Sequence, residues 1–203
     1  MRDNQDKEDK LLEYAGNQGG YFTAKQAFKA GYSYRLHSYH VRTGRWIKID
    51  RGVFRLKSSP AADREDLVRW TLWSRNHKDE PQMVASHETA LAIHDISDVS
   101  PAKFHFTAPL AFRKKVPHGV ILHRAVLKPE EVEKREGFFV TTPVRTLKDV
   151  AESHLSLDEL RKALQDARDR GLIQLKKIDI EGLSNHGKER MLTAFKGLDE
   201  RKR

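Results

Sequence analysis

The chain has 203 residues, of which 38% are hydrophobic and 33% charged, and its formal net charge is +9. This length allows one large or two small folded domains beneath a very polar surface. The absence of cysteine excludes disulfides, thiolate nucleophiles and cysteine-based zinc sites. Because no apolar run is long enough to span a bilayer or form a signal core, we expect a cytoplasmic protein with no membrane partner.

The N-terminal residues predict a first helix that ends at a pair of glycines. The helix is expected over about residues 5–17, and Gly19 and Gly20 follow it. Its apolar stripe consists of Leu11, Leu12 and Ala15.

Two short helices with glycine ends follow. Thr23 is a typical N-cap and predicts a helix over 24–30, in which Ala27 and Phe28 are expected to face the core. Ser33 predicts the start of a third helix over 34–43. Gly31 and Gly44 stand where each helix would need a left-handed residue. Two helices with this short connection have the spacing of a helix-turn-helix.

After the third helix the hydrophobic period changes from helical to two, which predicts a β-hairpin. Residues 50–52 form the turn, with Gly52 supplying a positive φ. One face is expected to be basic, with Lys48 and Arg55. The other is expected to be apolar, with Ile47, Ile49, Phe54 and Leu56. Three helices and a basic hairpin are the order of a winged helix.

Positive charge is concentrated in this segment. Residues 20–57 contain nine Lys or Arg and one acid, Asp50, whereas the chain from Ser58 onward has 26 Lys or Arg against 23 Asp or Glu. A local excess of basic residues on an element that fits a DNA groove is typical of phosphate binding.

One side of the third helix is polar and suited to DNA. At 100° per residue, Leu36, His37, His40 and Val41 fall on the opposite side, where the histidines are expected to be packed rather than functional. Arginine can contact guanine bidentately, while tyrosine and serine more often hold phosphates. An ordinary solvated helix face would show the same pattern, so that alternative stays open. The predicted DNA-binding residues of helix and hairpin are Tyr34, Arg35, Ser38, Tyr39, Arg42, Arg45, Lys48, Arg51 and Arg55.

A second domain of mixed helices and strands is expected after a linker at 58–62. The chain thus divides into a DNA-binding domain at 1–57 and a second domain at 63–203, and its class is α+β (mixed α/β). Helices are predicted over 64–76, 86–93, 157–170, from Pro143 and in the tail 185–203, which is expected to fray; strands are predicted over 104–108, 120–124 and 138–141.

No catalytic or metal-binding signature is complete. The His87-Glu88 pair begins like a zinc-protease helix, but Leu91 stands where the second histidine would be. His87 and His94 lie seven residues apart without an evident third ligand. Walker, dinucleotide-binding and nucleophile-elbow motifs are absent. We therefore expect no enzyme activity, no cofactor and no metal.

The motifs resemble those of the AbiEi family of type IV antitoxins and related transcriptional regulators. In the first domain the matching text is GGYFTAKQAFKAGYS, YHVRTGRW and RGVFRL. In the second domain it is SHETALAIHDI and TTPVRTLKDVAE. The resemblance covers roughly Leu11 to Glu152. Only about fifty residues follow its last motif, too few for the restriction-type nuclease domain that some relatives append.

The resemblance implies a division of labour between the two domains. The winged helix would bind operator DNA in the chain's own promoter, and the second domain would neutralise a cognate nucleotidyltransferase-like toxin. Homodimers on DNA are one arrangement it allows. Two alternatives stay open: a stand-alone transcription factor without a toxin, and a second domain that serves only for oligomerisation or ligand binding.

Overall fold

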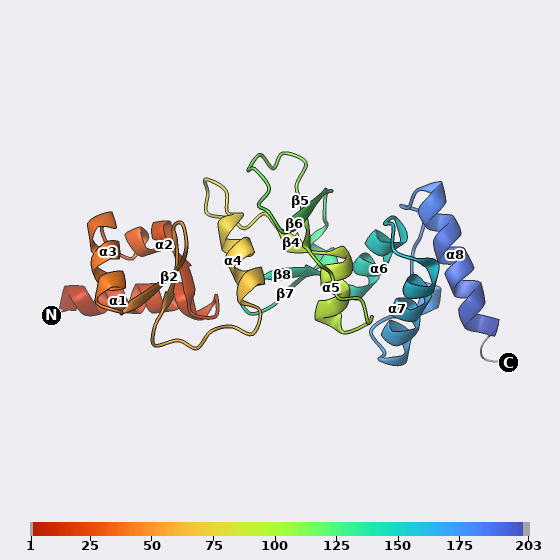
Figure 1. Cartoon of the computed structure of the whole chain (residues 1–203), viewed down its shortest axis with the longest axis horizontal. Coiled ribbons are helices and arrows are strands. Elements are labelled where there is room, and N and C mark those ends of the chain that lie inside the picture. The colour runs from red at the N-terminus through yellow and green to blue at the C-terminus, as the bar shows by residue number, and fades with distance from the viewer. Residues whose placement is uncertain (1, 201–203) are drawn as a thin grey trace. The chain divides into compact units, whose positions relative to one another are not determined.

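The computed structural model describes residues 2–200, with the side chains of residues 5–198. The chain forms two compact units (Figure 1). Unit 1 runs to Met83 and includes Lys134–Phe139; unit 2 consists of Val84–Glu133 and the chain from Val140 onward. Both units mix helices and strands, which confirms the expected class. Residues 201–203 of the tail that was expected to fray lie outside the described residues.

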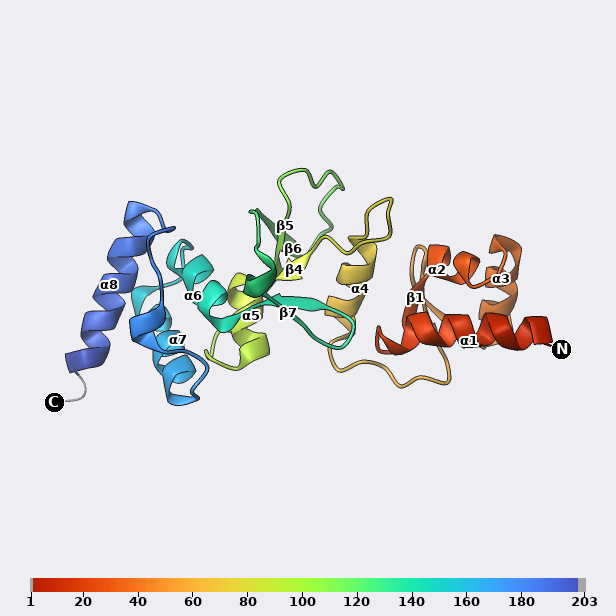
Figure 2. The ribbon, with the colours of Figure 1, turned by 180° about the vertical axis from the view of Figure 1, so that it is seen from behind.

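Unit 1 contains the winged-helix order expected from the sequence, with an additional strand. In Figures 1 and 2, α1 runs along one side of α2 and α3. The three strands are antiparallel in the order β1-β3-β2. The elements are α1 (Arg2–Gly16), β1 (Tyr21–Thr23), α2 (Ala24–Lys29), α3 (Tyr34–Arg42), β2 (Trp46–Asp50), β3 (Val53–Leu56) and α4 (Glu65–Trp73).

Local capping explains where the short helices begin and end. The Thr23 hydroxyl accepts a hydrogen bond from the Gln26 amide, and the Gln26 side chain accepts one from the Thr23 amide, which forms a capping box. Gly31 and Gly44 end their helices with φ of +101° and +71°, as expected. Gly52 has φ of +74° in the hairpin turn.

Two apolar residues expected in the core are exposed instead. Phe28 is 53% exposed and its ring stacks on Tyr34 at 5.2 Å. Leu36 is 41% exposed, although His37 and His40 of the same helix are buried as expected. In α2 the buried positions are Ala27, as expected, and Gln26, whose side-chain amide donates to Gln18 Oε1. A hydrogen-bonded polar side chain can therefore replace an apolar one in this small core.

The expected division of the hairpin into an apolar and a basic face is wrong. Trp46 lies opposite Leu56, and Ile47 lies opposite Arg55, so Ile47 shares a face with arginine. Lys48 lies opposite Phe54, on the other face. Residues directly opposite on an antiparallel pair project to the same side of the sheet. The register shifts between Lys48 and Asp50, which also breaks simple alternation at Ile49.

Unit 2 has a five-stranded sheet and four helices among its described residues. The strand order is β6-β5-β4-β8-β7, with β5 parallel to β6 and β4 parallel to β8. A largely helical core includes Leu147, Leu160, Leu164 and Met191. The elements are β4 (Val84–Ala85), α5 (His87–His94), β5 (Phe104–Ala108), β6 (Val120–Arg124), β7 (Val132–Lys134), β8 (Phe139–Thr141), α6 (Pro143–Ala151), α7 (Leu157–Asp169) and α8 (Asn185–Glu200), with 3₁₀ turns at Pro129–Glu131 and Leu175–Lys177.

The helix α4 lies in unit 1, whereas the sequence placed the start of the second domain before it. It packs against β1 and β3, and its Leu67 and Val68 are fully buried. Gly137, with φ of +80°, approaches Val68 so closely that a Cβ there would lie 2.9 Å from Cγ2. The boundary between compact units is therefore Met83, not the linker at 58–62.

We expect Gly44→Ala to destabilise the chain by about 1–2 kcal/mol, because a residue with a Cβ disfavours positive φ. A methyl group at Gly44 has room, since the nearest atom to an added Cβ, Lys57 Nζ, would be 3.8 Å away. The loss of stability would therefore measure the backbone strain at positive φ and not a steric clash. Urea denaturation measures it, with Gly182→Ala as the control, since Gly182 has neither positive φ nor a close neighbour. Equal effects of the two substitutions would contradict this explanation.

Candidate nucleic-acid interface

The buried side of α3 fixes which side of this helix faces outward. His37 Nε2 lies 3.0 Å from the Tyr32 carbonyl oxygen, and the His40 ring stacks on Trp46 at 4.7 Å. Burial lowers the pKa of both histidines, so both are neutral near pH 7. With these rings packed inward, the opposite side of α3 is presented to solvent.

That exposed side holds the five helical residues predicted to contact DNA, here called the recognition face. Tyr34 and Tyr39 are 60% and 46% exposed. The Arg42 guanidinium carbon lies over the Tyr39 ring, 6.0 Å from its centre, which is a cation–π contact. The members of the recognition face are Tyr34, Arg35, Ser38, Tyr39 and Arg42, all of them exposed.

The hairpin places its basic residues in different surroundings. Lys48 and Arg51 are exposed, and the Asp50 side chain accepts a hydrogen bond from the Arg51 amide at 2.6 Å. Arg55 is half-buried: it donates to the Ser59 carbonyl oxygen and lies over the Tyr21 ring. Of the predicted hairpin contacts, Lys48 and Arg51 are accessible, and Arg55 is held within unit 1. Arg45, also exposed, lies at the start of the hairpin.

The exposed cations differ in their partners. Among the described residues, no ion pair joins an acid to Arg35, Arg42, Lys48 or Arg51. On α2, by contrast, Lys25 donates to the His77 carbonyl oxygen and Lys29 pairs with Asp79 at 3.0 Å. Arg35, Arg42, Lys48 and Arg51 are thus among the cations of unit 1 that have no acidic partner in the described part of the chain.

Unit 2 contains a histidine cluster that the sequence did not reveal. His87 stacks on His123 at 3.5 Å, and His123 Nε2 lies 3.1 Å from His105 Nδ1. Glu88 Oε2 lies 2.8 Å from the same His105 nitrogen. Sequence spacing pointed to His94, but His94 Nε2 lies 2.7 Å from the Thr141 carbonyl oxygen instead. The two additional histidines come from β5 and β6, which only the sheet brings to α5.

Within this cluster His87 is buried, whereas His105, His123 and Glu88 are partly exposed. Burial and the neighbouring His123 lower the pKa of His87 to about 3, and His87 has an unusual φ of +52°. In the described part of the chain, no group of three or more His, Asp or Glu is arranged to hold a metal ion. The cluster is a set of packed imidazoles beside one carboxylate.

A second polar network lies within the TTPVRTLKDVAE segment. Arg145 donates to Asp149 and to Glu131, both at 2.8 Å. Burial raises the pKa of Asp149 to about 6, against the opposing effect of Arg145. The arginine thus ties α6 to the turn before β7. In this network the segment supports the fold of unit 2.

Comparison with known proteins supports the winged-helix interpretation. Residues 9–57 match the family described as "Transcriptional regulator, AbiEi antitoxin". The AbiEi resemblance is confirmed for this segment. The AbiEi match includes all nine predicted DNA-binding residues and ends before α4. It supports a regulatory, DNA-binding role.

The fold of the chain also has a counterpart among solved structures. The crystal structure of the RV2827C protein from Mycobacterium tuberculosis superposes with a TM-score of 0.58 and 13% sequence identity. The match covers 92% of this chain and 74% of that one, and at this identity it shows a shared fold alone. No curated protein matches the sequence. Within residues 2–200, no helix has the length and apolar character needed to cross a membrane.

We expect His87 to make the chain less stable as the pH falls. Its folded pKa, about 3, lies below the unfolded value of about 6.5, so only the unfolded state gains a proton between these values. From pH 7.5 to pH 5 this costs about 2 kcal/mol, and the loss should be absent in His87→Asn, a residue that tolerates positive φ. Urea denaturation at both pH values measures the difference.

The raised pKa of Asp149 acts in the opposite direction, so the quantity compared is the pH dependence of the variant against that of the unmodified chain. His118→Asn is the control, because His118 is exposed in the same unit. An unchanged pH dependence in His87→Asn would show that His87 is not the group responsible.

Proposed function

We propose that this protein is a cytoplasmic, DNA-binding antitoxin that represses its own operon through residues 1–57 and acts without catalysis. The observation that carries the proposal is the recognition face beside the hairpin, whose exposed cations have no acidic partner among the described residues. Phosphates would supply the missing counter-charges. The AbiEi match to residues 9–57 supports the same role.

Within this interface we assign different tasks to helix and hairpin. The side chains of Arg35 and Arg42 project from a helix of suitable size for the major groove, where arginine reads guanine. Lys48 lies in the first strand of the hairpin and Arg51 in its turn. A wing in this position would follow the phosphate backbone. Tyr34, Ser38 and Tyr39 would position α3 through phosphate contacts. Arg55 would contribute least, because its guanidinium is already bonded to Ser59.

The second part of the proposal concerns the residues beyond 63, which we propose neutralise a nucleotidyltransferase-like toxin. The chain from Ser58 onward is nearly balanced in charge, with 26 Lys or Arg and 23 Asp or Glu. Mixed charge suits a protein partner, because complementary pairs can form without overall repulsion. The resemblance of the motifs in this part of the chain supports the same assignment.

We expect Arg42→Ala to reduce sequence discrimination and Lys48→Ala to reduce affinity for all DNA. A lost base contact costs on the order of 1–3 kcal/mol on the operator alone. A lost phosphate contact weakens every duplex similarly and lowers the salt slope by about one. Binding isotherms on operator and scrambled duplexes at several salt concentrations separate the two effects. Arg64→Ala, an exposed arginine outside the interface, is the control.

The placement of α3 would be refuted by equal losses for Arg42→Ala on operator and scrambled DNA. Normal binding by a variant with both Arg35 and Arg42 replaced by alanine would refute the DNA interface itself. Circular dichroism of each variant confirms that a loss of binding does not come from unfolding.

We expect toxin neutralisation to persist when DNA binding is lost. The full-length variant Arg35→Ala/Arg42→Ala changes only exposed side chains of α3, so both units should stay folded. Growth of cells that co-express this variant and the toxin encoded beside it, both from foreign promoters, is the measurement. Growth arrest with the variant but not with the unmodified chain would show that neutralisation requires DNA binding. Absence of a toxin gene from the operon would favour a stand-alone regulator.

A further inference from the structure

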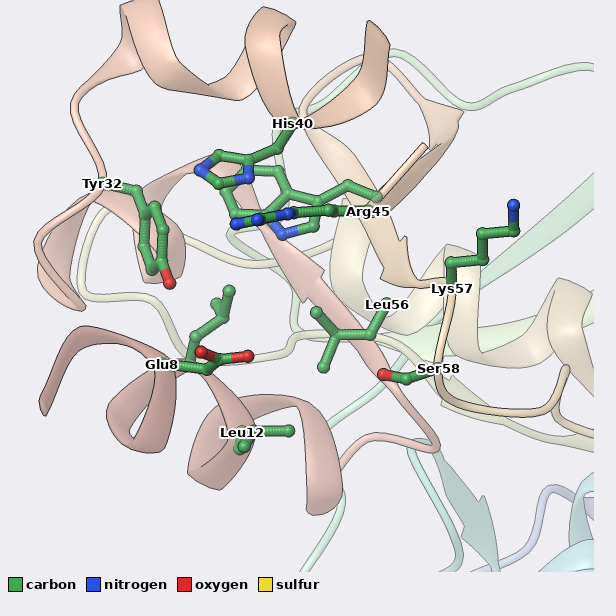
Figure 3. Close-up of a pocket in the computed structure, with 10 residues that line it drawn as sticks. Glu8, Leu12, Tyr32, His40, Arg45, Leu56, Lys57 and Ser58 are labelled. Atoms are coloured by element: carbon green, nitrogen blue, oxygen red, sulfur yellow. The ribbon is translucent and has the colours of Figure 1, made fainter. Parts of the chain in front are cut away.

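Unit 1 contains a cavity whose lining includes only one of the predicted DNA-binding residues, Arg45. It has a volume of about 670 Å³ and lies between α1, the end of α3 and the sheet. Figure 3 shows Glu8 on the α1 side and His40 and Arg45 on the opposite side, with Tyr32 beside them. The volume is within the range of small-molecule sites in proteins.

Opposite charges line this cavity without neutralising each other. Glu8 belongs to α1 and Arg45 to the chain after α3, and both are exposed. Both charges act on Tyr32, whose pKa is raised mainly by burial, raised further by Glu8 and lowered by Arg45. Among the described residues neither side chain forms an ion pair, and Lys57 adds a second cation at the rim. The space between these charges suits a molecule that carries one charge of each sign.

The cavity wall also contains a polar atom without a partner. His40 is 8% exposed, and its Nδ1 is buried with no hydrogen bond among the described residues. Burial and Arg45 lower the pKa of this imidazole, so it is neutral. A buried polar atom without a partner calls for an explanation, such as a water molecule or a ligand.

Most of the remaining wall is apolar, apart from Ser58. Leu11 and Leu56 are buried behind it, whereas Leu12 is 47% exposed at its edge. A leucine exposed beside a cavity gives an apolar ligand group a surface to cover. The lining therefore combines an acid, an arginine and an apolar wall.

We propose that this cavity binds a free amino acid with an apolar side chain. The ligand's carboxylate would pair with the Arg45 guanidinium, in the bidentate geometry that arginine favours. Its ammonium group would pair with Glu8, and its side chain would lie against Leu12. A nucleotide fits less well, because two phosphate charges would be placed near the Glu8 carboxylate. Such a site is additional to the DNA-binding and antitoxin roles and does not depend on them.

The test is isothermal titration of the full-length protein with L-leucine and L-phenylalanine, and with two analogues of phenylalanine. 3-Phenylpropanoate lacks the ammonium group, and 2-phenylethylamine lacks the carboxylate. We expect at least one amino acid to bind and to raise the melting temperature. Each analogue should bind about tenfold more weakly or worse, because a charged hydrogen-bond partner is left unpaired.

Two variants then assign each charge to its partner. Glu8→Gln should bind L-phenylalanine and 3-phenylpropanoate equally, since the partner of the ammonium group is gone. Arg45→Gln should remove the preference over 2-phenylethylamine in the same way. Glu13→Gln and Arg64→Gln, exposed and outside the cavity, should keep both preferences.

Three results would overturn the proposal. The first is no binding of any amino acid with an apolar side chain to the folded protein. The second is equal affinity of amino acid and analogues in the unmodified chain. The third is binding of adenosine monophosphate that Arg45→Gln abolishes while the amino acids do not bind, which would make the cavity a site for phosphate-bearing ligands.

Discussion

The packing of Trp46 is the interaction on which unit 1 depends. Its indole lies 4.7–5.7 Å, ring centre to ring centre, from five other rings: Phe22, Tyr32, His37, His40 and Phe54. These rings come from β1, the connection between α2 and α3, α3 itself and β3. One side chain of β2 thus joins the helix of the recognition face to β1 and β3. Aromatic pairs in edge and stacked geometries add about 0.5–1.5 kcal/mol each beyond their buried area.

This aromatic core also determines the state of the two histidines on α3. An imidazolium among these rings would be desolvated, which is why burial lowers the pKa of His37 and His40. A neutral histidine packs as an aromatic ring, and the Nε2 atom of His37 contacts the Tyr32 carbonyl oxygen. Because the histidines occupy the inner side, the arginines of α3 are left on the outer side. The residues that the core of unit 1 can bury therefore determine which residues of α3 remain exposed for the interface.

Periodicity predicted the helices of this fold well and the sheet register poorly. Glycine and capping residues mark helix ends locally, so α2 and α3 begin and end where Thr23, Gly31 and Gly44 place them. Register depends on partners distant in sequence, and a bulge at Lys48–Asp50 altered it without a local signal. The strands β1, β4 and β7 were missed because two or three residues are too short to show alternation. The position of α4 depends on packing against β1 and β3, which no linker composition encodes.

The candidate sites divide along the same line. The recognition face could be predicted because five residues of one helix share a side by helical spacing alone, whereas the position of Arg55 depends on Ser59 and Tyr21, which pairing brings to it. Glu8 and Arg45 meet at one cavity only through the packing of α1 on the sheet. Charge depends on tertiary contacts in the same way. Lys29 of α2 contributes to the basic composition of residues 20–57, yet it already pairs with Asp79. Net charge locates a basic segment, but the tertiary partners decide which of its cations remain for a ligand.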